Sequence, residues 1–265
     1  MTYTVLARCG STHQVGVGIT TASISFGGVG PICTLDGDIV VSQAYWNPAV
    51  GIDAARMVTA GVAWETLLEE LRARDPYLEY RQLGVVRADG RCHAHTGSSC
   101  RSNAHHLLRQ QADGSAVLVK GGNFCDHKGM LQAMLRGFES GSDAPLAERL
   151  LRALEAGRDA GGQADAEGNH FAERSAKLRV LGWVGAQLPE PASGASAAPE
   201  IDLQVDSHPT AVEELRRLYA TCSQVLPYNA LRCLDPPATP TWGEWSEAAG
   251  VEGLLPPLLT PDPRL

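Results

Sequence analysis

Thr2 is the residue whose type and position first suggest chemistry. The chain begins Met1-Thr2, and methionine aminopeptidases remove an initiator methionine that precedes a small residue. We therefore expect a mature chain that begins at Thr2. An N-terminal threonine carries a hydroxyl nucleophile beside its own base, because a free α-amine titrates near about 8. Threonine is common at position two, so this prediction gains weight only if the chain end is held rigidly.

Polar residues at the ends of apolar runs are candidates for a binding pocket near such a nucleophile. Gln43 and Asn47 bracket an apolar run and could orient polar groups of a substrate. Asn47 also precedes Pro48, a pattern typical of a helix cap. His95 and Thr96 end a predicted hairpin strand and are expected to line the same cleft, although Thr96 could simply pair across the sheet.

A histidine cluster raises a second possible chemistry. Four of the eight histidines are His93, His95, His105 and His106, and Cys125 and His127 follow. His93 and His95 would share one face of a strand, which is the geometry of a metal-binding pair. The ordinary alternative is one inward histidine and three exposed ones. We favour that alternative and predict neither a metal nor a cofactor.

Composition excludes several classes of partner and location. The chain has 22 basic and 30 acidic residues, and the basic residues form no cluster. Nucleic acid and anionic membranes are therefore not expected partners. No apolar run reaches the roughly 18–20 residues of a membrane span, and no secretory signal opens the chain. The seven cysteines contain no C-x-x-C, so we expect reduced thiols in a cytoplasmic protein.

Charge is distributed unevenly along the chain. The first 60 residues contain only five charged side chains. Because protein surfaces are built largely from charged residues, this segment is expected to lie mostly inside the molecule. Chain ends usually lie loose on the surface, so a buried N-terminus suggests that its position matters.

Alternating apolar residues and helical periodicity predict the elements that would position these side chains. Antiparallel strand pairs alternate with helix pairs, an order that favours an α+β fold with two sheets covered by helices on both outer faces. The predicted strands are Tyr3–Ala7, Val15–Ile19, Ile39–Tyr45, Gln82–Arg87, Arg91–Thr96, Val117–Lys120, Leu178–Leu181 and Ile201–Val205. Predicted helices follow Asn47-Pro48 and include the apolar stripes Trp64–Leu71, Leu131–Phe138, Ala147–Leu154 and Val212–Tyr219.

The C-terminal part differs in composition. Residues 187–199 are rich in alanine, serine and proline, which predicts a surface loop, and eight of the sixteen prolines follow residue 226. We predict one domain over residues 1–222 and a proline-rich tail over 223–265. Trp242 and Trp245 could act as a clasp between subunits, so a homo-oligomer is expected.

Nine segments, in the same order along the chain, resemble the domain of unknown function 1028 family. These segments are Thr2–Arg8, Val15–Gly18, Ser42–Gly51, Tyr80–Val86, Ala88–Arg91, His95–Gly97, Gly122–Asn123, Pro145–Leu151 and Asp206–Pro209. The resemblance covers about residues 2–220 and implies an N-terminal-nucleophile (Ntn) hydrolase-like fold, a four-layer αββα sandwich. The family pattern has aspartate where this chain has Cys9, and Gly-Gly-Asp where it has Gly161-Gly162-Gln163.

The resemblance implies an Ntn amidohydrolase that cleaves a small amide, imide or short peptide. Thr2 would be the nucleophile, and Asn123 would stabilise the oxyanion, although Asn123 could instead cap the following loop or helix. The expected substrate-binding residues are Gln43, Tyr45, Asn47, Arg81, His95 and Thr96. The alternative is a catalytically inactive Ntn-like protein that binds a ligand or partner, which the Cys9 and Gln163 departures would explain.

Overall fold

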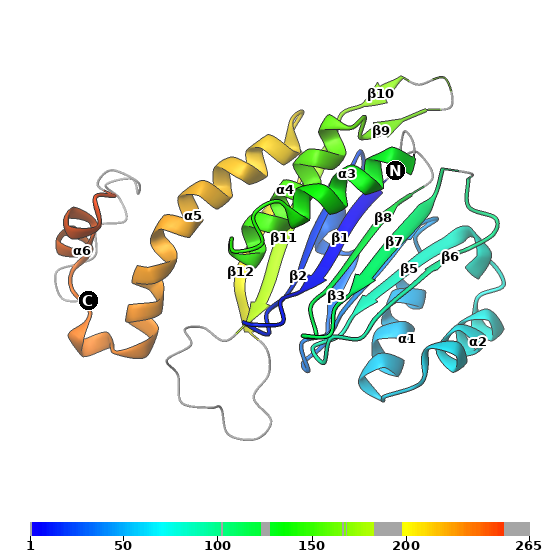
Figure 1. Ribbon diagram of the computed structural model, residues 1–265, viewed down its shortest axis with the longest axis horizontal. Coiled ribbons are helices and arrows are strands. Elements are labelled where there is room, and N and C mark those ends of the chain that lie inside the picture. Colours follow the sequence, from blue (N-terminus) through cyan, green and yellow to red (C-terminus); the bar gives the residue numbers. More distant parts are fainter. Residues whose placement is uncertain are drawn as a thin grey trace.

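A six-stranded antiparallel sheet forms the centre of the protein (Figure 1). The computed structural model describes residues 2–101, 103–122, 128–165, 167, 169–182 and 198–251. The strand order is β12-β11-β2-β1-β8-β7, so β1, which begins at Thr2, is an inner strand paired on both sides. The strands are β1 (Thr2–Arg8), β2 (Val15–Thr21), β7 (His105–Gln110), β8 (Ala116–Gly121), β11 (Ser175–Gly182) and β12 (Ala198–Val205).

A four-stranded antiparallel sheet lies against one face of the first, in the order β3-β4-β5-β6. Its strands are β3 (Pro31–Cys33), β4 (Ile39–Ala44), β5 (Arg81–Val86) and β6 (Cys92–Thr96). The hairpin of β5 and β6 closes through Asp89-Gly90, where Gly90 has a φ of 92° that favours glycine. A separate two-stranded ribbon pairs β9 (Gln163–Ala164) with β10 (His170–Phe171).

Helices cover the outer face of each sheet. The described residues form α1 (Pro48–Thr59), α2 (Trp64–Arg74), α3 (Lys128–Glu139), α4 (Leu146–Asp159), α5 (Ala211–Leu234) and α6 (Trp242–Ala249). The short 3₁₀ helices are η1 (Phe26–Gly28), η2 (Leu78–Tyr80) and η3 (Pro236–Ala238). Helices α3, α4 and the start of α5 pack on the six-stranded sheet, whereas α1 and α2 pack on the four-stranded sheet.

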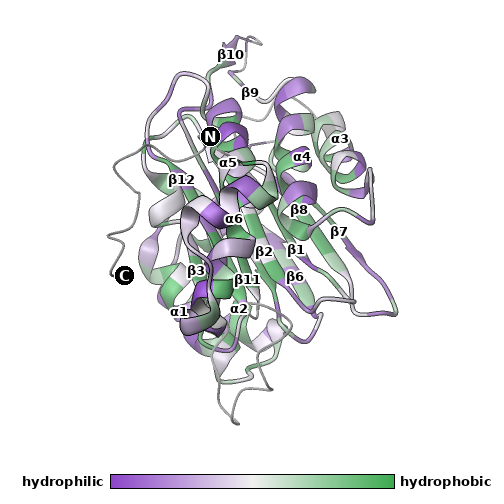
Figure 2. Ribbon diagram, turned by 90° about the vertical axis from the view of Figure 1, so that its left-hand side faces the viewer, coloured by the Kyte–Doolittle hydropathy of each residue, from purple (hydrophilic) through white to green (hydrophobic). Residues whose placement is uncertain are grey.

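Three apolar clusters follow from the alternation of side chains along the strands. Tyr3, Val5 and Ala7 of β1 point toward α3 and α4. Leu6, one position away, points between the two sheets, where it meets Val41 and Leu118. A third cluster joins the far side of the four-stranded sheet to α1 and α2. The predominantly hydrophobic colouring of the strands in Figure 2 reflects this burial on both faces.

Close contact between α4 and the central sheet depends on a glycine in β2. A Cβ on Gly16 would lie 2.6 Å from Leu150 Cδ1, a distance that a side chain cannot tolerate without movement. Leu150 itself is fully buried. The glycine-rich second strand, charge-free in the sequence, therefore lets a helix lie directly on the sheet.

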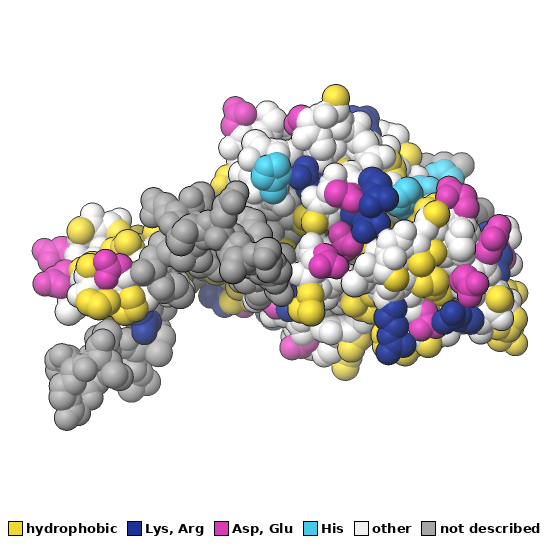
Figure 3. Space-filling model, turned by 90° about the horizontal axis from the view of Figure 1, so that it is seen from below, with side chains coloured by type: hydrophobic (Ala, Val, Ile, Leu, Met, Phe, Trp, Pro, Cys, Tyr) yellow, Lys and Arg dark blue, Asp and Glu magenta, His cyan; other side chains and the backbone are white. Residues whose placement is uncertain are grey.

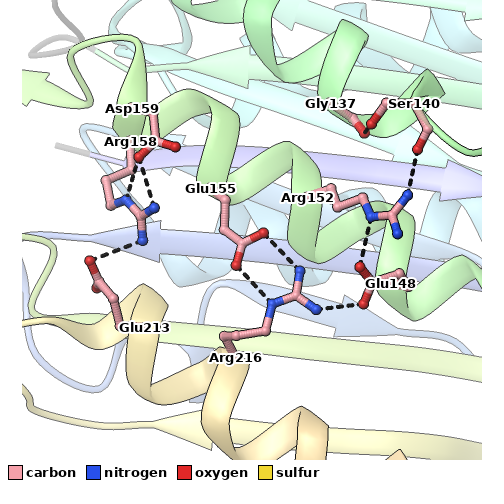
Figure 4. A network of polar contacts seen from close by, with 9 residues as sticks. All are labelled: Gly137, Ser140, Glu148, Arg152, Glu155, Arg158, Asp159, Glu213 and Arg216. Carbon is pink, nitrogen blue, oxygen red and sulfur yellow. Dashed lines mark hydrogen bonds and ion pairs between the residues drawn. The ribbon is translucent and has the colours of Figure 1, made fainter.

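Helix α5 begins on the sheet and then leads away from it (Figure 1). Its first turns are fastened to α4 by ion pairs, in which Arg216 contacts Glu155 at 2.7 Å and also Glu148, while Arg158 contacts Glu213 at 2.9 Å (Figure 4). Pro227 lies inside the helix, which continues to Leu234 and so crosses the predicted domain boundary at residue 222. The division into a domain and a tail stays a prediction.

The surface carries mixed charge. On the face seen in Figure 3, basic and acidic side chains are interspersed, and the part that contains α6 stands apart from the body with hydrophobic side chains on its surface. Tyr228, Trp242 and Trp245 pack together there, with ring centroids 5.1–5.3 Å apart. In the described part of the chain, no helix is both long and apolar enough to span a bilayer.

The predicted mixture of antiparallel sheets and helices is confirmed, and every predicted strand is present. The sequence did not predict β3, β7, β9, β10 or α6. Residues 187–197 of the predicted loop 187–199 lie outside the described residues. The last two positions of that loop belong to β12.

Candidate functional site

Thr2 opens the inner strand β1 and is almost completely buried, with 5% of its surface exposed. Its carbonyl oxygen accepts hydrogen bonds from the Gly122 amide at 2.8 Å and from Gln43 Nε2 at 3.1 Å. Its hydroxyl donates to Thr21 Oγ1 at 3.1 Å, and Thr21 is its direct partner across β1 and β2. The start of the chain is therefore held by both neighbouring strands and by the second sheet.

The backbone of Gly122 lies close to Thr2. A Cβ on Gly122 would lie 3.1 Å from the Thr2 carbonyl oxygen, which is a tight contact, and 3.5 Å from its nitrogen. The Gly122 amide also makes a shorter hydrogen bond to that carbonyl than Gln43 does. Gly122 thus allows the close backbone approach that fixes Thr2.

Beside Thr2, a polar network fills one end of the layer between the sheets. Thr4, Lys120 and His106 lie side by side across β1, β8 and β7. Facing them, three neighbours cross β4, β5 and β6 in the same way, namely Gln43, Gln82 and Thr96. The two rows meet because the same strand periodicity that directs Leu6 and Leu118 inward also directs these polar side chains inward.

Hydrogen bonds join the two rows into a continuous chain. Thr4 Oγ1 donates to Gln43 Oε1 at 2.6 Å, and Gln43 Nε2 donates to Gln82 Oε1 at 3.0 Å. Gln82 Nε2 donates to Thr96 Oγ1 at 3.0 Å, and Thr96 Oγ1 lies 2.9 Å from His106 Nδ1. Gln43 and Gln82 are fully buried. At such positions an unsatisfied donor or acceptor would lower the stability of the fold, and these hydrogen bonds avoid that loss.

Lys120 contributes the amine of this network and is 1% exposed. Its Nζ donates to the Val41 carbonyl at 2.6 Å. Burial holds the pKa of Lys120 well below its usual value, because a low-dielectric interior disfavours the ammonium form. Space for its stem comes from Gly84, where a Cβ would lie 3.3 Å from Lys120 Cε.

A cavity of about 430 Å³ opens beside Thr96 and His106. It lies between the end of β6 and the start of β7 and is also lined by Gly97, Ser98, Cys100, Arg101, Ala104 and His105. Burial, and then the nearby His105, Lys120 and His95, lower the pKa of His106. His106 is therefore predominantly neutral at neutral pH.

The structure brings some of the predicted substrate-binding residues together and separates others. Gln43 and Thr96 belong to the polar network. His95 points to the opposite face of β6, toward the helix side, where its Nε2 is buried without a hydrogen-bond partner in the structure and burial lowers its pKa. Thr96 and His95 therefore do not line one cleft, because neighbouring strand residues face opposite ways.

The remaining predicted residues have structural partners at the other side of β4 and β5. Arg81 Nε donates to Asp75 Oδ2 at 2.5 Å, and its Nη1 donates to the Tyr45 carbonyl. The Tyr45 ring is 51% exposed and packs edge-on against Tyr80. Asn47 caps α1, because its Oδ1 accepts from the Ala49 amide at 3.0 Å. The structure thus contains the helix cap that the sequence offered as the other interpretation of Asn47.

Two predicted elements of the reaction lie outside the described residues. These are Met1 and the proposed oxyanion donor Asn123. Cys125 and His127 of the histidine cluster also lie there. Among the described residues, no group of three or more His, Cys, Asp or Glu side chains could hold a metal ion.

Gln163, one of the two departures noted in the sequence, lies close to the partner strand of Thr2. It is fully buried, and its Oε1 accepts from the Ala22 amide at 3.0 Å, directly after Thr21. Its Nε2 has no hydrogen-bond partner in the structure. Cys9 lies beyond the far end of β1, and although burial opposes its ionisation, hydrogen bonds from Ser11 and Thr12 lower its pKa to about 7.

Sequence reasoning missed Gln82, Lys120, His106 and Thr21 as members of the site. For Gln82 the signal was the register of the predicted hairpin, because alternation in β5 and β6 places Gln82 and Thr96 on one face. The partners in β7 and β8 required knowledge of which strands are neighbours across a long sequence separation.

The architecture defines an α+β protein with two stacked antiparallel sheets, and comparisons with known proteins identify its family. Residues 2–215 match the family of unknown function DUF1028, and the chain belongs to this family. The crystal structure of protein SPO2555 from Silicibacter pomeroyi, also described by the DUF1028 family model, is similar in fold. It superposes with a TM-score of 0.66 at 24% sequence identity, covering 84% of this chain and 86% of that one. No curated protein matches the sequence.

Proposed function

We propose that the protein is an N-terminal-nucleophile amidohydrolase whose nucleophile is Thr2 after removal of Met1. The observation that carries this proposal is the fixation of Thr2 at the start of an inner strand. Its carbonyl is held by Gly122 and Gln43, and its hydroxyl is held by Thr21. The first residues of a chain are rarely held this rigidly for structural reasons alone, whereas a nucleophile at the chain end must be held rigidly.

The layer arrangement supports the same class. Helices α3 and α4 cover one sheet, α1 and α2 cover the other, and the sheets pack face to face. The Ntn class, in its four-layer αββα form, has this order of layers. The proposed fold assignment therefore agrees with the position of Thr2.

In the proposed reaction, Thr2 Oγ1 attacks the carbonyl carbon of an amide. The α-amine of Thr2 takes the hydroxyl proton, directly or through a water. Collapse of the tetrahedral intermediate breaks the C–N bond, and the proton passes from the α-amine to the leaving nitrogen. A water then attacks the Thr2 ester, the amine again accepts the proton, and the acid is released with regeneration of the hydroxyl.

Asn123 is the proposed oxyanion donor in this scheme. Loss of one such donor typically costs about 10²–10³ in rate. Gln43 is a proposed substrate contact and also a positioning residue, because its Nε2 holds the Thr2 carbonyl. We propose a small amide, imide or short peptide as substrate. Free thiols are present at Cys9, Cys33, Cys92, Cys100 and Cys222, which supports the cytoplasm as the proposed location.

The decisive experiment combines mass spectrometry with variants of Thr2. Purified protein is expected to lack Met1 and to hydrolyse a member of a panel of N-acyl amino acids, peptide amides and cyclic imides. Thr2→Ala is expected to reduce turnover at least about a thousandfold with an unchanged melting temperature, whereas Thr2→Ser retains measurable turnover. Retention of Met1 on active protein, or full turnover by Thr2→Ala, would refute the proposal.

Gln163 favours a second candidate, a catalytically inactive protein of the same fold that binds a ligand. A neutral amide occupies a buried position beside the Thr2–Thr21 pair where the family pattern has a carboxylate. Loss of that negative charge would weaken support for a protonated α-amine. A covalent adduct on Thr2 after treatment with an electrophilic amide probe, detected by peptide mapping, would exclude this candidate.

A further inference from the structure

The direction of the hydrogen bonds between the sheets is fixed by backbone carbonyls, which can only accept. Gln43 Nε2 lies 3.1 Å from the Thr2 carbonyl, so the amide nitrogen of Gln43 must face that side. Gln82 Nε2 likewise lies 2.9 Å from the Gly121 carbonyl and 3.2 Å from the His105 carbonyl. Neither amide can be turned over without placing an oxygen against a carbonyl oxygen.

This order leaves the Thr96 hydroxyl able to donate to the ring of His106. Gln82 Nε2, whose two hydrogens face Thr96 Oγ1 and the Gly121 and His105 carbonyls, cannot accept from Thr96, so the Thr96 hydroxyl proton is available for His106 Nδ1 at 2.9 Å. In a neutral imidazole whose Nδ1 accepts, the proton resides on Nε2. With Thr96 as the donor, His106 is a hydrogen-bond donor through Nε2 at the wall of the cavity that it lines.

The cavity around His106 has a matching electrostatic character. Its described lining contains Arg101 and two histidines but no aspartate or glutamate. Glu79, the acid next to this loop, is already bound by the Ser98 amide at 2.8 Å and by Arg72 at 3.3 Å. The volume of about 430 Å³ falls within the range of small-ligand pockets.

We propose that this cavity binds the carboxylate of the substrate, with His106 Nε2–H as a directed donor and Arg101 as the counter-charge. The inference rests on the proposed function and narrows it: the substrate is an amide that carries a free carboxylate, such as an N-acyl amino acid or a short peptide. A carboxylate offers only acceptors, which suits a fixed donor and an arginine. His106 is then a specificity-determining residue for this substrate class.

The first test measures the tautomer of His106 in the wild-type protein and needs no substrate. Long-range ¹H–¹⁵N correlation spectra, with His106→Gln used for assignment, are expected to show neutral His106 protonated on Nε2 at pH 7. A neutral ring protonated on Nδ1, or a charged ring, would overturn the proposal. Because the wild-type protein is measured, failure of a variant to fold does not affect this result.

The second test measures binding in the Thr2→Ala protein, so that turnover plays no part. N-acetyl-L-alanine is expected to perturb the His106 ring signals and to bind at least about tenfold more tightly than its methyl ester. Equal binding of the two compounds, or binding without any effect on His106, would contradict carboxylate recognition here. Full turnover by Thr2→Ala would instead refute the proposed function, so the two failures are distinguishable.

Variants of His106 separate the donor from mere cavity shape. In His106→Gln the amide nitrogen can reach the place of Nε2, whereas in His106→Asn the shorter amide lies near the place of Nδ1. For N-acetyl-L-alanine we expect KM to rise about 10–100-fold in His106→Asn and clearly less in His106→Gln. KM for the methyl ester should rise clearly less than KM for the acid in both, and all constants should stay unchanged in the control His170→Gln, an exposed histidine. An equal KM rise for acid and ester would show that only shape was lost.

Discussion

The layer between the two sheets has two ends that are built from the same strands but from opposite kinds of residue. At one end, Leu6, Val41 and Leu118 form an apolar cluster. Two positions along the same three strands, Thr4, Gln43 and Lys120 form part of the polar network. Strand geometry is the same at both ends, so the difference lies in the side chains alone.

The stability of the fold does not by itself require polar residues at this end of the layer. An apolar layer would give more favourable burial free energy, about 25 cal/mol per Å² of apolar surface. Buried amides and a buried amine contribute little net stability, because their hydrogen bonds mainly offset lost hydration. The polar end is thus best explained by the position of Thr2 and the cavity beside it.

The largest stability effect is expected at the apolar end. Leu118→Ala would leave a cavity at a fully buried position in a tightly packed layer, so the free energy of unfolding should fall by about 2–5 kcal/mol. Chemical denaturation measures this. The control is Leu108→Ala, which changes the direct cross-strand partner of Leu118 at a 36% exposed position and should cost less than about 1 kcal/mol. Similar losses in both variants would contradict the assigned core.

A smaller loss is expected when the polar network is cut. Gln82→Met keeps the approximate shape but removes the donor to the Gly121 and His105 carbonyls. Leaving buried carbonyls unpaired should reduce the free energy of unfolding by about 1–3 kcal/mol. Gln110→Met is the matched control, because Gln110 also donates to a carbonyl, that of Gly90 at 2.9 Å, but is exposed. If Gln82→Met proved neutral or stabilising, the network would not be formed as described.

Lys120 should make stability depend on pH in a way that Lys120→Met removes. Burial lowers the pKa of Lys120 in the folded state, whereas an unfolded lysine titrates near about 10.4. Between these two values the unfolded chain binds the extra proton, so the contribution of Lys120 to stability increases as pH rises. Relative to wild type, Lys120→Met should therefore gain most at low pH and lose that advantage toward pH about 10. Denaturation curves of both proteins across this range test it, and parallel pH profiles would contradict a buried lysine with a lowered pKa.

Cysteine labelling tests whether the apolar end stays closed in the wild-type protein, without a substitution that changes stability. Burial raises the pKa of Cys92, a member of the apolar cluster, to about 12, whereas the pKa of Cys9 is about 7. Iodoacetamide at pH 7 should thus modify Cys9 before Cys33, Cys92, Cys100 and Cys222, and should reach Cys92 only on global unfolding. Peptide mapping over time measures both rates. Early labelling of Cys92 would show that the apolar end opens locally.

Much of the fold was predictable because its inner strands alternate clearly. The predicted strand Tyr3–Ala7 lies within β1, and the predicted hairpin matches β5 and β6 except for Arg87 and Arg91, which lie in the turn between them. β7 was missed because His105–Gln110 is a polar edge strand with half of its residues exposed, so it lacks the apolar alternation of a core strand. Helix α5 runs past Pro227 to Leu234, into residues that composition had assigned to the proline-rich tail.

The candidate site was predictable only where one local pattern contained the answer. Thr2 and Gln43 were found from their places at the start of one strand and the end of another. Lys120 and His106 were not, since each becomes part of the site only through pairing with strands far away in sequence. His95 and Thr96 were predicted together because they are adjacent, but alternation along β6 turns them to opposite faces.

The place of β1 in the six-stranded sheet also sets the order of events during synthesis. β1 can pair with β2 early, but its other partner β8 begins at Ala116, and the sheet extends to β11 only at Ser175. At roughly 5–20 residues per second, a ribosome needs on the order of 5–25 s to deliver β8 after β1 has emerged. During that interval the second neighbouring strand of β1, and with it the Gly122 amide that binds the Thr2 carbonyl, is still missing. The first residues of the chain are therefore enclosed on that side only after β8 has been made.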